Sequence, residues 1–236
     1  KDCLKNDSAC PFQGSLANAK SQVASFLKSM ETKTLPTKDG RKLTITSATT
    51  GLIMALYSDT YWPYLTQAFN EAKKSKEGST FILLADFYND RDESGKYASN
   101  SLEANIAINC LDSRSSAKPD AMAKQNERIL QLSPVLGRYW QNGALICEQW
   151  PYPVAKRPAS YSAKGAPTIL VIGTTGDPAT PYQQSVALAH EVLAKGFLIT
   201  FDGEGHTAYG RSNECVSLAV DDFFISGTIP NKEPVC

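Results

Sequence analysis

Apolar residues recur at helical spacing through the first part of the chain. In the interval 15–30 the apolar positions fall close to one stripe of a helix: Leu16, Val23, Phe26, Leu27 and Met30. The same spacing predicts helices at 50–57, 62–74, 79–88, 100–111 and 120–132. The run 79–88 is apolar on nearly all sides, which predicts a buried helix. A turn is expected at 38–41, where Gly40 follows Lys38-Asp39.

The pattern changes after an irregular, proline-rich connector at 150–167. The runs 168–172 and 197–201 are apolar on both faces, as in strands covered by helices on each side. Between them we expect a helix capped by Thr180, opened by Pro181 and stopped by Gly196. A last helix is expected to start at Ser212 or Asn213 and to end at Gly227.

This order of elements predicts a β-α-β-α unit with parallel strands, so the fold class is α/β. We divide the chain into a helical region, 1–160, and a C-terminal segment, 161–236, that carries the two strands.

Composition narrows the possible partners. The 236 residues include 24 basic and 24 acidic residues, and no Lys/Arg-rich block that would favour nucleic acid. No apolar run approaches the roughly 20 residues of a membrane span. We therefore expect neither nucleic acid nor a membrane span.

The six cysteines indicate disulfides rather than a metal site. The count is even, no C-x-x-C occurs and the chain has only 2 histidines, so we expect no metal. Disulfides in an oxidising compartment are favoured over buried free thiols. Of the roughly 15 possible connectivities, local spacing favours Cys3–Cys10, Cys215–Cys236 and, as the remaining pair, Cys110–Cys147. The motif Asn6-Asp7-Ser8 is a glycosylation sequon.

Two polar residues follow the predicted strands. Asp177 comes after the apolar run 169–173, and His206 lies between glycines after 197–202. This is the order in which an α/β-hydrolase carries its acid and base after the nucleophilic serine. The alternatives are a turn aspartate before Pro178 and a loop histidine with no role. No G-x-S-x-G elbow occurs in the chain, and the other histidine, His190, is expected on a helix surface.

The motifs GTTGDPATPY, DGEGHTAYG, IAINCLD and CEQWP, with the closing CVSLAVDDFF, resemble the C-terminal half of secreted tripeptidyl aminopeptidases. These are α/β-hydrolases of the prolyl-iminopeptidase-like serine peptidase family. The resemblance implies a partial α/β-hydrolase fold, with Asp177 as triad acid and His206 as base. It also implies that 1–160 is a helical lid, that no cofactor is needed, and that the protein is secreted or resides in the cell envelope.

The lid is expected to recognise the substrate. An aminopeptidase binds a free α-ammonium group, for which carboxylates are the best partners, and the candidates are Glu103 and Asp112. The alternative is that both are solvated helix charges. Six aromatic residues could line a peptide cleft or pack as ordinary core: Tyr57, Tyr61, Trp62, Tyr64, Trp140 and Trp150.

Three functions are compatible with these observations. The first is a serine exopeptidase of which this chain supplies the lid, acid and base; the second is an esterase or lipase on the same fold; the third is a module that binds a peptide or a partner. Because the nucleophile is absent, we expect the isolated chain to be inactive. The first strand should also present an open edge, which would pair with the serine-bearing N-terminal half or with a second copy.

Overall fold

The computed structural model describes residues 1–6 and 8–236. Asp7 lies outside the described residues, and so therefore does the sequon of which it is the centre. By its contacts the chain forms two compact units, Lys1–Met54 with Pro63–Lys156, and Ala55–Trp62 with Arg157–Cys236. The boundary after Lys156 lies close to the one expected after residue 160. The segment Ala55–Trp62, which the sequence division left in the helical region, belongs to the second unit instead.

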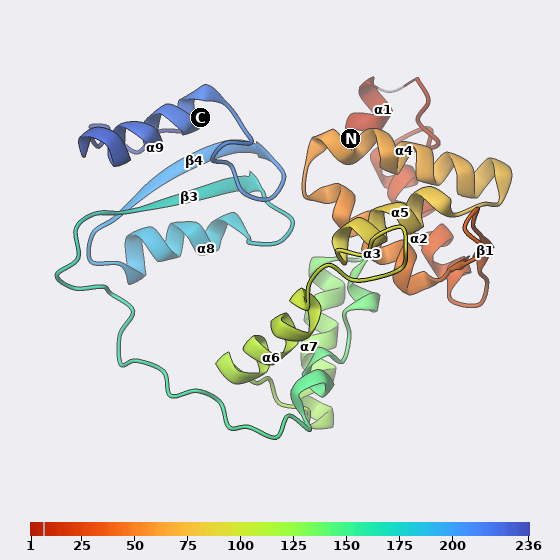
Figure 1. Cartoon of the computed structure of the whole chain (residues 1–236), viewed down its shortest axis with the longest axis horizontal. Coiled ribbons are helices and arrows are strands. Elements are labelled where there is room, and N and C mark those ends of the chain that lie inside the picture. The colour runs from red at the N-terminus through yellow and green to blue at the C-terminus, as the bar shows by residue number, and fades with distance from the viewer. Residues whose placement is uncertain (7) are drawn as a thin grey trace. The chain divides into compact units, whose positions relative to one another are not determined.

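The first part of the chain is helical apart from one short hairpin (Figure 1). Its elements, in chain order, are α1 (Asp2–Asn6), α2 (Leu16–Met30), β1 (Leu35–Pro36), β2 (Lys42–Leu43), α3 (Ile45–Leu56), η1 (Asp59–Tyr61), α4 (Trp62–Asn70), η2 (Glu71–Ser75), α5 (Ser79–Tyr88), α6 (Ser101–Asp112), α7 (Pro119–Leu132), η3 (Gly137–Tyr139) and η4 (Gly143–Cys147). The predicted helices are confirmed, although α3 begins five residues before the predicted start at residue 50. The turn at 38–41 joins β1 to β2, two strands that the apolar pattern did not predict.

Aromatic side chains form the centre of the first unit. The ring of Phe69 lies 5.4 Å from that of Phe26 and 5.1 Å from that of Phe81, and Phe26 stacks on Phe81. The expectation that α5 is buried on all sides is wrong for one face, because Leu83 is 59% exposed and Phe87 is 58% exposed. The buried face of α5 carries Phe81, Leu84 and Ala85.

The second unit contains the parallel strands. Its elements are β3 (Ile169–Gly176), α8 (Tyr182–Ala187), the π-helical turn η5 (Leu188–Val192), β4 (Gly196–Glu204) and α9 (Glu214–Ser226). β3 pairs with β4 in parallel, with Val171 opposite Leu198. Both strands lie between α8 and α9 (Figure 1). The β-α-β-α order and the parallel pairing confirm the predicted α/β class.

Each face of the strand pair packs against a helix. Val171 and Leu198 contact Ala189 and the α8 side chains on one face. Ile199 packs with Val216 and Val220 of α9 on the other. α9 begins where Asn213 accepts a hydrogen bond from the Val216 N–H at 3.1 Å, and it ends at Gly227, as predicted.

The helix after β3 ends earlier than predicted. The η5 turn closes at Val192, and Leu193 has extended backbone, so the helix does not reach Lys195. Gly196 opens β4 instead of stopping a helix. A Cβ at Gly196 would lie 2.2 Å from the carbonyl oxygen of Ala189, so glycine is required for the close approach of strand and helix.

The two edges of the strand pair differ. The C-terminal tail lies along β4, where the Thr200 N–H donates to the Pro234 carbonyl (3.0 Å) and the Cys236 N–H donates to the Thr200 carbonyl (2.8 Å). In the part of the chain that the structure describes, β3 has no strand neighbour other than β4. The outer edge of β3 is therefore open to a further strand.

Three disulfides join the six cysteines: Cys3–Cys10, Cys110–Cys147 and Cys215–Cys236. These are the pairs that local spacing favours. Cys215 at the start of α9 is thereby tied to the C-terminal residue, which holds the tail against β4. Among the described residues, no helix is long and apolar enough to cross a membrane.

Candidate active site: an aspartate and a histidine at neighbouring strand ends

The carboxyl ends of β3 and β4 place Asp177 and His206 side by side. Parallel strands end at the same edge of a sheet, so the loops that follow them meet there. The register slips between Thr174 and Gly176, which marks a bulge just before Asp177. The Thr175 hydroxyl accepts a hydrogen bond from the Gly203 N–H (3.1 Å) across this irregularity. Such bulges often lie beside active sites, where they redirect a side chain.

Asp177 is held by its own loop. Its Oδ1 accepts hydrogen bonds from the backbone N–H groups of Ala179 (2.8 Å) and Thr180 (2.9 Å), and its Oδ2 accepts one from the Thr180 hydroxyl (2.9 Å). The side chain is only 4% exposed. Burial alone would raise the pKa of Asp177, but these donors and His206 outweigh burial and lower it. Asp177 is therefore a carboxylate at neutral pH.

This carboxylate also contacts the imidazole of His206. The Nδ1 atom lies 3.0 Å from Oδ1 and 2.9 Å from Oδ2 of Asp177. An ionised carboxylate can only accept, so Nδ1 must be the donor, and this fixes the tautomer of a neutral ring. The other ring nitrogen, Nε2, is then the one that can take a proton from a reacting group.

The loop that carries His206 has unusual backbone on both sides. Gly205 has φ +106°, and Thr207 has φ 66°, which is rare for a β-branched residue. The His206 N–H donates to the carbonyl oxygen of Tyr57 at 2.8 Å. A Cβ at Gly205 would lie 3.0 Å from that same oxygen. Glycine is needed there both for its φ and for this close approach.

A small cavity lies beside Asp177. It measures about 220 Å³ and its lining residues are Ile172, Thr174, Asp177, Thr180, Ser185, Thr207, Ala208 and Tyr209. The loops after β3 and β4 both contribute to it, so it lies at the carboxyl edge of the strands. In an open α/β sheet this is the edge where ligands bind.

The expected helix cap at Thr180 is wrong. The residue before α8 is Pro181, and no side chain caps this helix. The Thr180 hydroxyl donates to Asp177 instead. The helix starts one residue later than expected, so the N-cap position falls on Pro181, whose side chain cannot accept a hydrogen bond.

His190 lies outside this site. Its side chain is 45% exposed, as expected for a surface residue, and Nε2 lies 2.9 Å from the Glu233 carboxylate. Glu233 also accepts a hydrogen bond from the Leu198 N–H (2.9 Å). This pair fastens the tail to η5 and β4, a contact that the sequence pattern does not predict.

The two predicted substrate carboxylates belong to the first unit. Glu103 lies in the first turn of α6 and Asp112 at its last position, and both residues are exposed. Their role in binding an α-ammonium group stays a prediction. Of the six aromatic candidates, Tyr57 contacts His206, with ring centroids 5.1 Å apart.

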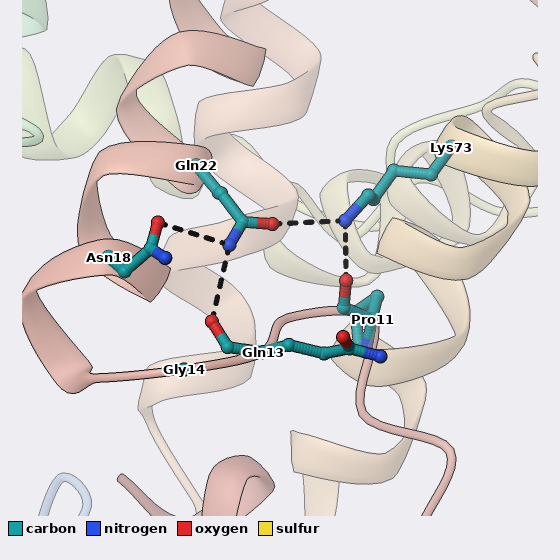
Figure 2. A pocket seen from close by; sticks show the side chains of 6 residues that line it. All are labelled: Pro11, Gln13, Gly14, Asn18, Gln22 and Lys73. Atoms are coloured by element: carbon teal, nitrogen blue, oxygen red, sulfur yellow. Dashed lines mark hydrogen bonds between the residues drawn. The ribbon is translucent and has the colours of Figure 1, made fainter.

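A larger and more open hollow, of about 580 Å³, lies in the first unit (Figure 2). Its polar side chains bond to one another. Lys73 donates to the carbonyl of Pro11 and to Gln22 Oε1 (3.2 Å), and Gln22 donates to the Gln13 carbonyl (3.5 Å). These bonds hold the N-terminal segment against α2 and η2, so the hollow has a structural explanation. Among the described residues no group of three or more His, Cys, Asp or Glu could hold a metal ion.

The class of protein follows from these observations. Parallel strands with helices on both faces, carrying an acid and a base at successive strand ends, form part of an α/β-hydrolase fold. Residues 133–236 match the family described as TAP-like protein. This segment therefore contains a TAP-like domain of the α/β-hydrolase type.

Relatives extend the similarity to the whole chain. The chain is 37% identical to Carboxylesterase B of Mycobacterium tuberculosis over 238 residues, covering 100% of this chain and 45% of that protein. It is 35% identical to Serine protease Hip1 of the same organism, covering 100% of this chain and 46% of that protein. It is 25% identical to a Tripeptidyl aminopeptidase of Streptomyces lividans over 77% of this chain and 34% of that protein. The chain thus spans about half the length of the curated relatives it matches, and corresponds to the C-terminal portions of serine hydrolases.

Proposed function

We propose that Asp177 and His206 are the acid and base of a Ser-His-Asp triad whose serine lies in a part of the protein outside this sequence. The observation that carries the proposal is the contact of the Asp177 carboxylate with His206 Nδ1, at 2.9 and 3.0 Å. That contact leaves Nε2 as the proton acceptor. A serine hydroxyl needs such a base, because it is a weak nucleophile at neutral pH.

The reaction is acyl transfer. His206 Nε2 takes the proton as the serine oxygen attacks the substrate carbonyl, and Asp177 stabilises the imidazolium that forms. The same proton then passes to the leaving amine or alcohol as the carbon–heteroatom bond breaks. Water repeats the sequence on the acyl-enzyme and releases the acid. This chain supplies the acid–base half of each step.

The substrate we propose is a peptide bound by its free N-terminus, with Glu103 and Asp112 as candidate partners of the α-ammonium group. Similarity to a tripeptidyl aminopeptidase supports this choice. The test uses the full-length protein and two tripeptidyl chromogenic amides, one with a free and one with an acetylated N-terminus. The free substrate should be preferred, and Glu103→Gln should raise KM for that substrate only. Asp120→Asn, a change of another exposed acid at the start of α7, serves as control.

Ester hydrolysis is the second candidate, because a similar relative is named Carboxylesterase B. The triad serves both substrates equally well. Parallel assays of the same protein on the peptidyl amide and on a short-chain ester separate the two. A kcat/KM for the ester far above that for any peptidyl amide would replace the peptidase proposal. If neither substrate is turned over, the remaining proposal is a module that binds a peptide or a partner without catalysis.

We also propose that the serine-bearing half pairs with the outer edge of β3. The supporting observation is that the tail covers the far edge of β4, whereas β3 has no second strand neighbour among the described residues. Light scattering on a mixture of the two halves should give the mass of a one-to-one complex. A dimer of this chain alone that persists in the mixture would point to self-association instead.

The three disulfides support a location in an oxidising compartment. We propose that the protein is secreted or resides in the cell envelope. Fractionation of cells that express the full-length protein, followed by thiol titration of each fraction, tests this.

A further inference from the structure

We infer that Tyr57 is a positioning residue for His206, acting through both its backbone carbonyl and its ring. The inference rests on the proposed role of His206 as the base. It concerns a residue from the far end of the sequence: Tyr57 immediately follows α3, whereas His206 follows β4. The segment Ala55–Trp62 nevertheless belongs to the same compact unit as the two strands.

The first contact fixes the backbone of the base. The carbonyl oxygen of Tyr57 accepts the His206 N–H at 2.8 Å. His206 lies in a loop, so this N–H takes part in no strand ladder, and the Tyr57 carbonyl supplies its partner. The buried residue Gly205 lets the two backbones approach, since any Cβ there would be 3.0 Å from the Tyr57 oxygen. The loop sequence is thus adapted to the presence of Tyr57.

The second contact restricts the ring of the base. The Tyr57 ring meets the imidazole edge to face, with centroids 5.1 Å apart and an angle of 72° between planes. Such pairs are stabilising beyond the area that they bury. Asp177 holds Nδ1 but leaves rotation about the Nδ1–carboxylate axis open. An aromatic ring packed against the imidazole limits that rotation, and so fixes the direction in which Nε2 points.

The experiment needs no catalytic serine and uses the chain as it is. The Nδ1–H proton of His206, hydrogen-bonded to Asp177, should give a resolved downfield proton resonance in NMR. In Tyr57→Ala and Tyr57→Leu this resonance should be lost to exchange with water. In Tyr57→Phe, which keeps the ring, it should remain. Tyr161→Ala removes an exposed tyrosine of the same unit and should leave the resonance unchanged.

The Leu variant keeps apolar bulk, and thermal unfolding of each variant shows whether it is folded at the temperature of the measurement. In full-length protein that is active, Tyr57→Leu should lower kcat by about 10- to 100-fold with little change in KM, since a displacement of about 1 Å can have an effect of this size. Tyr57→Phe should restore most of the activity.

Two results would overturn the inference. One is an Nδ1–H resonance unchanged in folded Tyr57→Leu. The other is a kcat of folded Tyr57→Leu equal to that of wild type. Neither result bears on whether His206 is the base, which is tested separately by replacing His206 itself.

Discussion

The loops after β3 and β4 carry the proposed acid and base, and they are stabilised in different ways. The acid loop is self-contained: every backbone or hydroxyl donor to Asp177 comes from the next three residues. The base loop depends on a distant segment, because the His206 N–H and ring both contact Tyr57. The base loop also contains Thr207 at positive φ. A carboxylate can be oriented by local turn geometry, whereas an imidazole that must point in one direction needs contacts from outside its loop.

The largest effect on activity is expected from replacing Asp177 or His206. In the full-length protein, His206→Ala and Asp177→Asn should each lower kcat by roughly 10⁴-fold or more, since the members of a triad act as a unit. Steady-state kinetics on whichever substrate proves active measure this. His190→Ala, which removes the surface histidine paired with Glu233, is the control and should retain activity. Full turnover by the His206 variant would end the triad assignment.

Gly205→Ala should damage the base loop. An alanine at φ +106° is strained and its Cβ would crowd the Tyr57 carbonyl. We expect a loss of about 1–3 kcal/mol in the free energy of unfolding, together with lower activity. Denaturant unfolding measures the stability change.

Gly210→Ala is the matched control for this change. Gly210 also has positive φ, at +72°, but a Cβ there would meet nothing within 4 Å. Gly210→Ala should lower the free energy of unfolding only by the strain of the backbone, about 1 kcal/mol. Equal losses at the two glycines would show that the contact with Tyr57 adds nothing.

Thr180→Val tests the acid loop. Removing the hydroxyl that donates to Asp177 should raise the lowered pKa of this carboxyl toward its ordinary value. We expect the free energy of unfolding of Thr180→Val to be about 1 kcal/mol lower than that of wild type at about pH 7. A depressed carboxyl pKa stabilises the fold above the unfolded value of about 3.9, and this contribution disappears as the pH falls through the folded pKa.

The difference between Thr180→Val and wild type should therefore shrink as the pH is lowered below about 4. Urea unfolding at a series of pH values measures it. Thr180→Ser keeps the hydroxyl and should behave like wild type. A difference that stays constant down to the lowest pH would mean that the hydroxyl does not act through the charge on Asp177.

The smallest effect is expected at Thr207. Asparagine tolerates positive φ better than a β-branched residue, so Thr207→Asn should stabilise the protein by about 0.5–1 kcal/mol. Thr228→Asn changes another exposed threonine, which does not have positive φ, and should be neutral. Thermal unfolding compares the two. Destabilisation by Thr207→Asn would indicate that the threonine side chain makes a contact worth more than the strain.

Strand order made the contact between Asp177 and His206 predictable from the sequence. Asp177 and His206 each follow an apolar, β-branched run. Parallel strands end at the same edge of a sheet, so residues that follow neighbouring strands lie close together. The cysteine pairs could also be predicted from the sequence, because two of the three disulfides close short loops. Tyr57 was one of six aromatic candidates, and nothing in the sequence distinguished it. Its contact with His206 depends on the tertiary placement of a loop that sequence periodicity assigned to the helical region.

The two errors lie at the two ends of the helical segment between β3 and β4. A Thr-Pro pair before a helical run is typical of a capped helix start. Here the Thr180 hydroxyl donates to the Asp177 carboxylate and does not cap the helix. A glycine after a helical run is typical of a helix stop, but Gly196 serves the close contact between β4 and Ala189. At Thr180 the helix begins one residue later than the pattern indicates, and at Gly196 the close packing of β4 on the preceding helix requires the glycine.

Reconstitution from two halves shows whether His206 of this chain serves as the base for the serine. This chain, as wild type or as His206→Ala, is mixed with the serine-bearing half of the protein, and labelling of the serine by a fluorophosphonate is followed together with turnover of the active substrate. We expect no labelling or turnover with this chain alone, recovery of both with the wild-type mixture, and loss of both with His206→Ala. Turnover by the isolated chain, or equal recovery with wild type and His206→Ala, would contradict it.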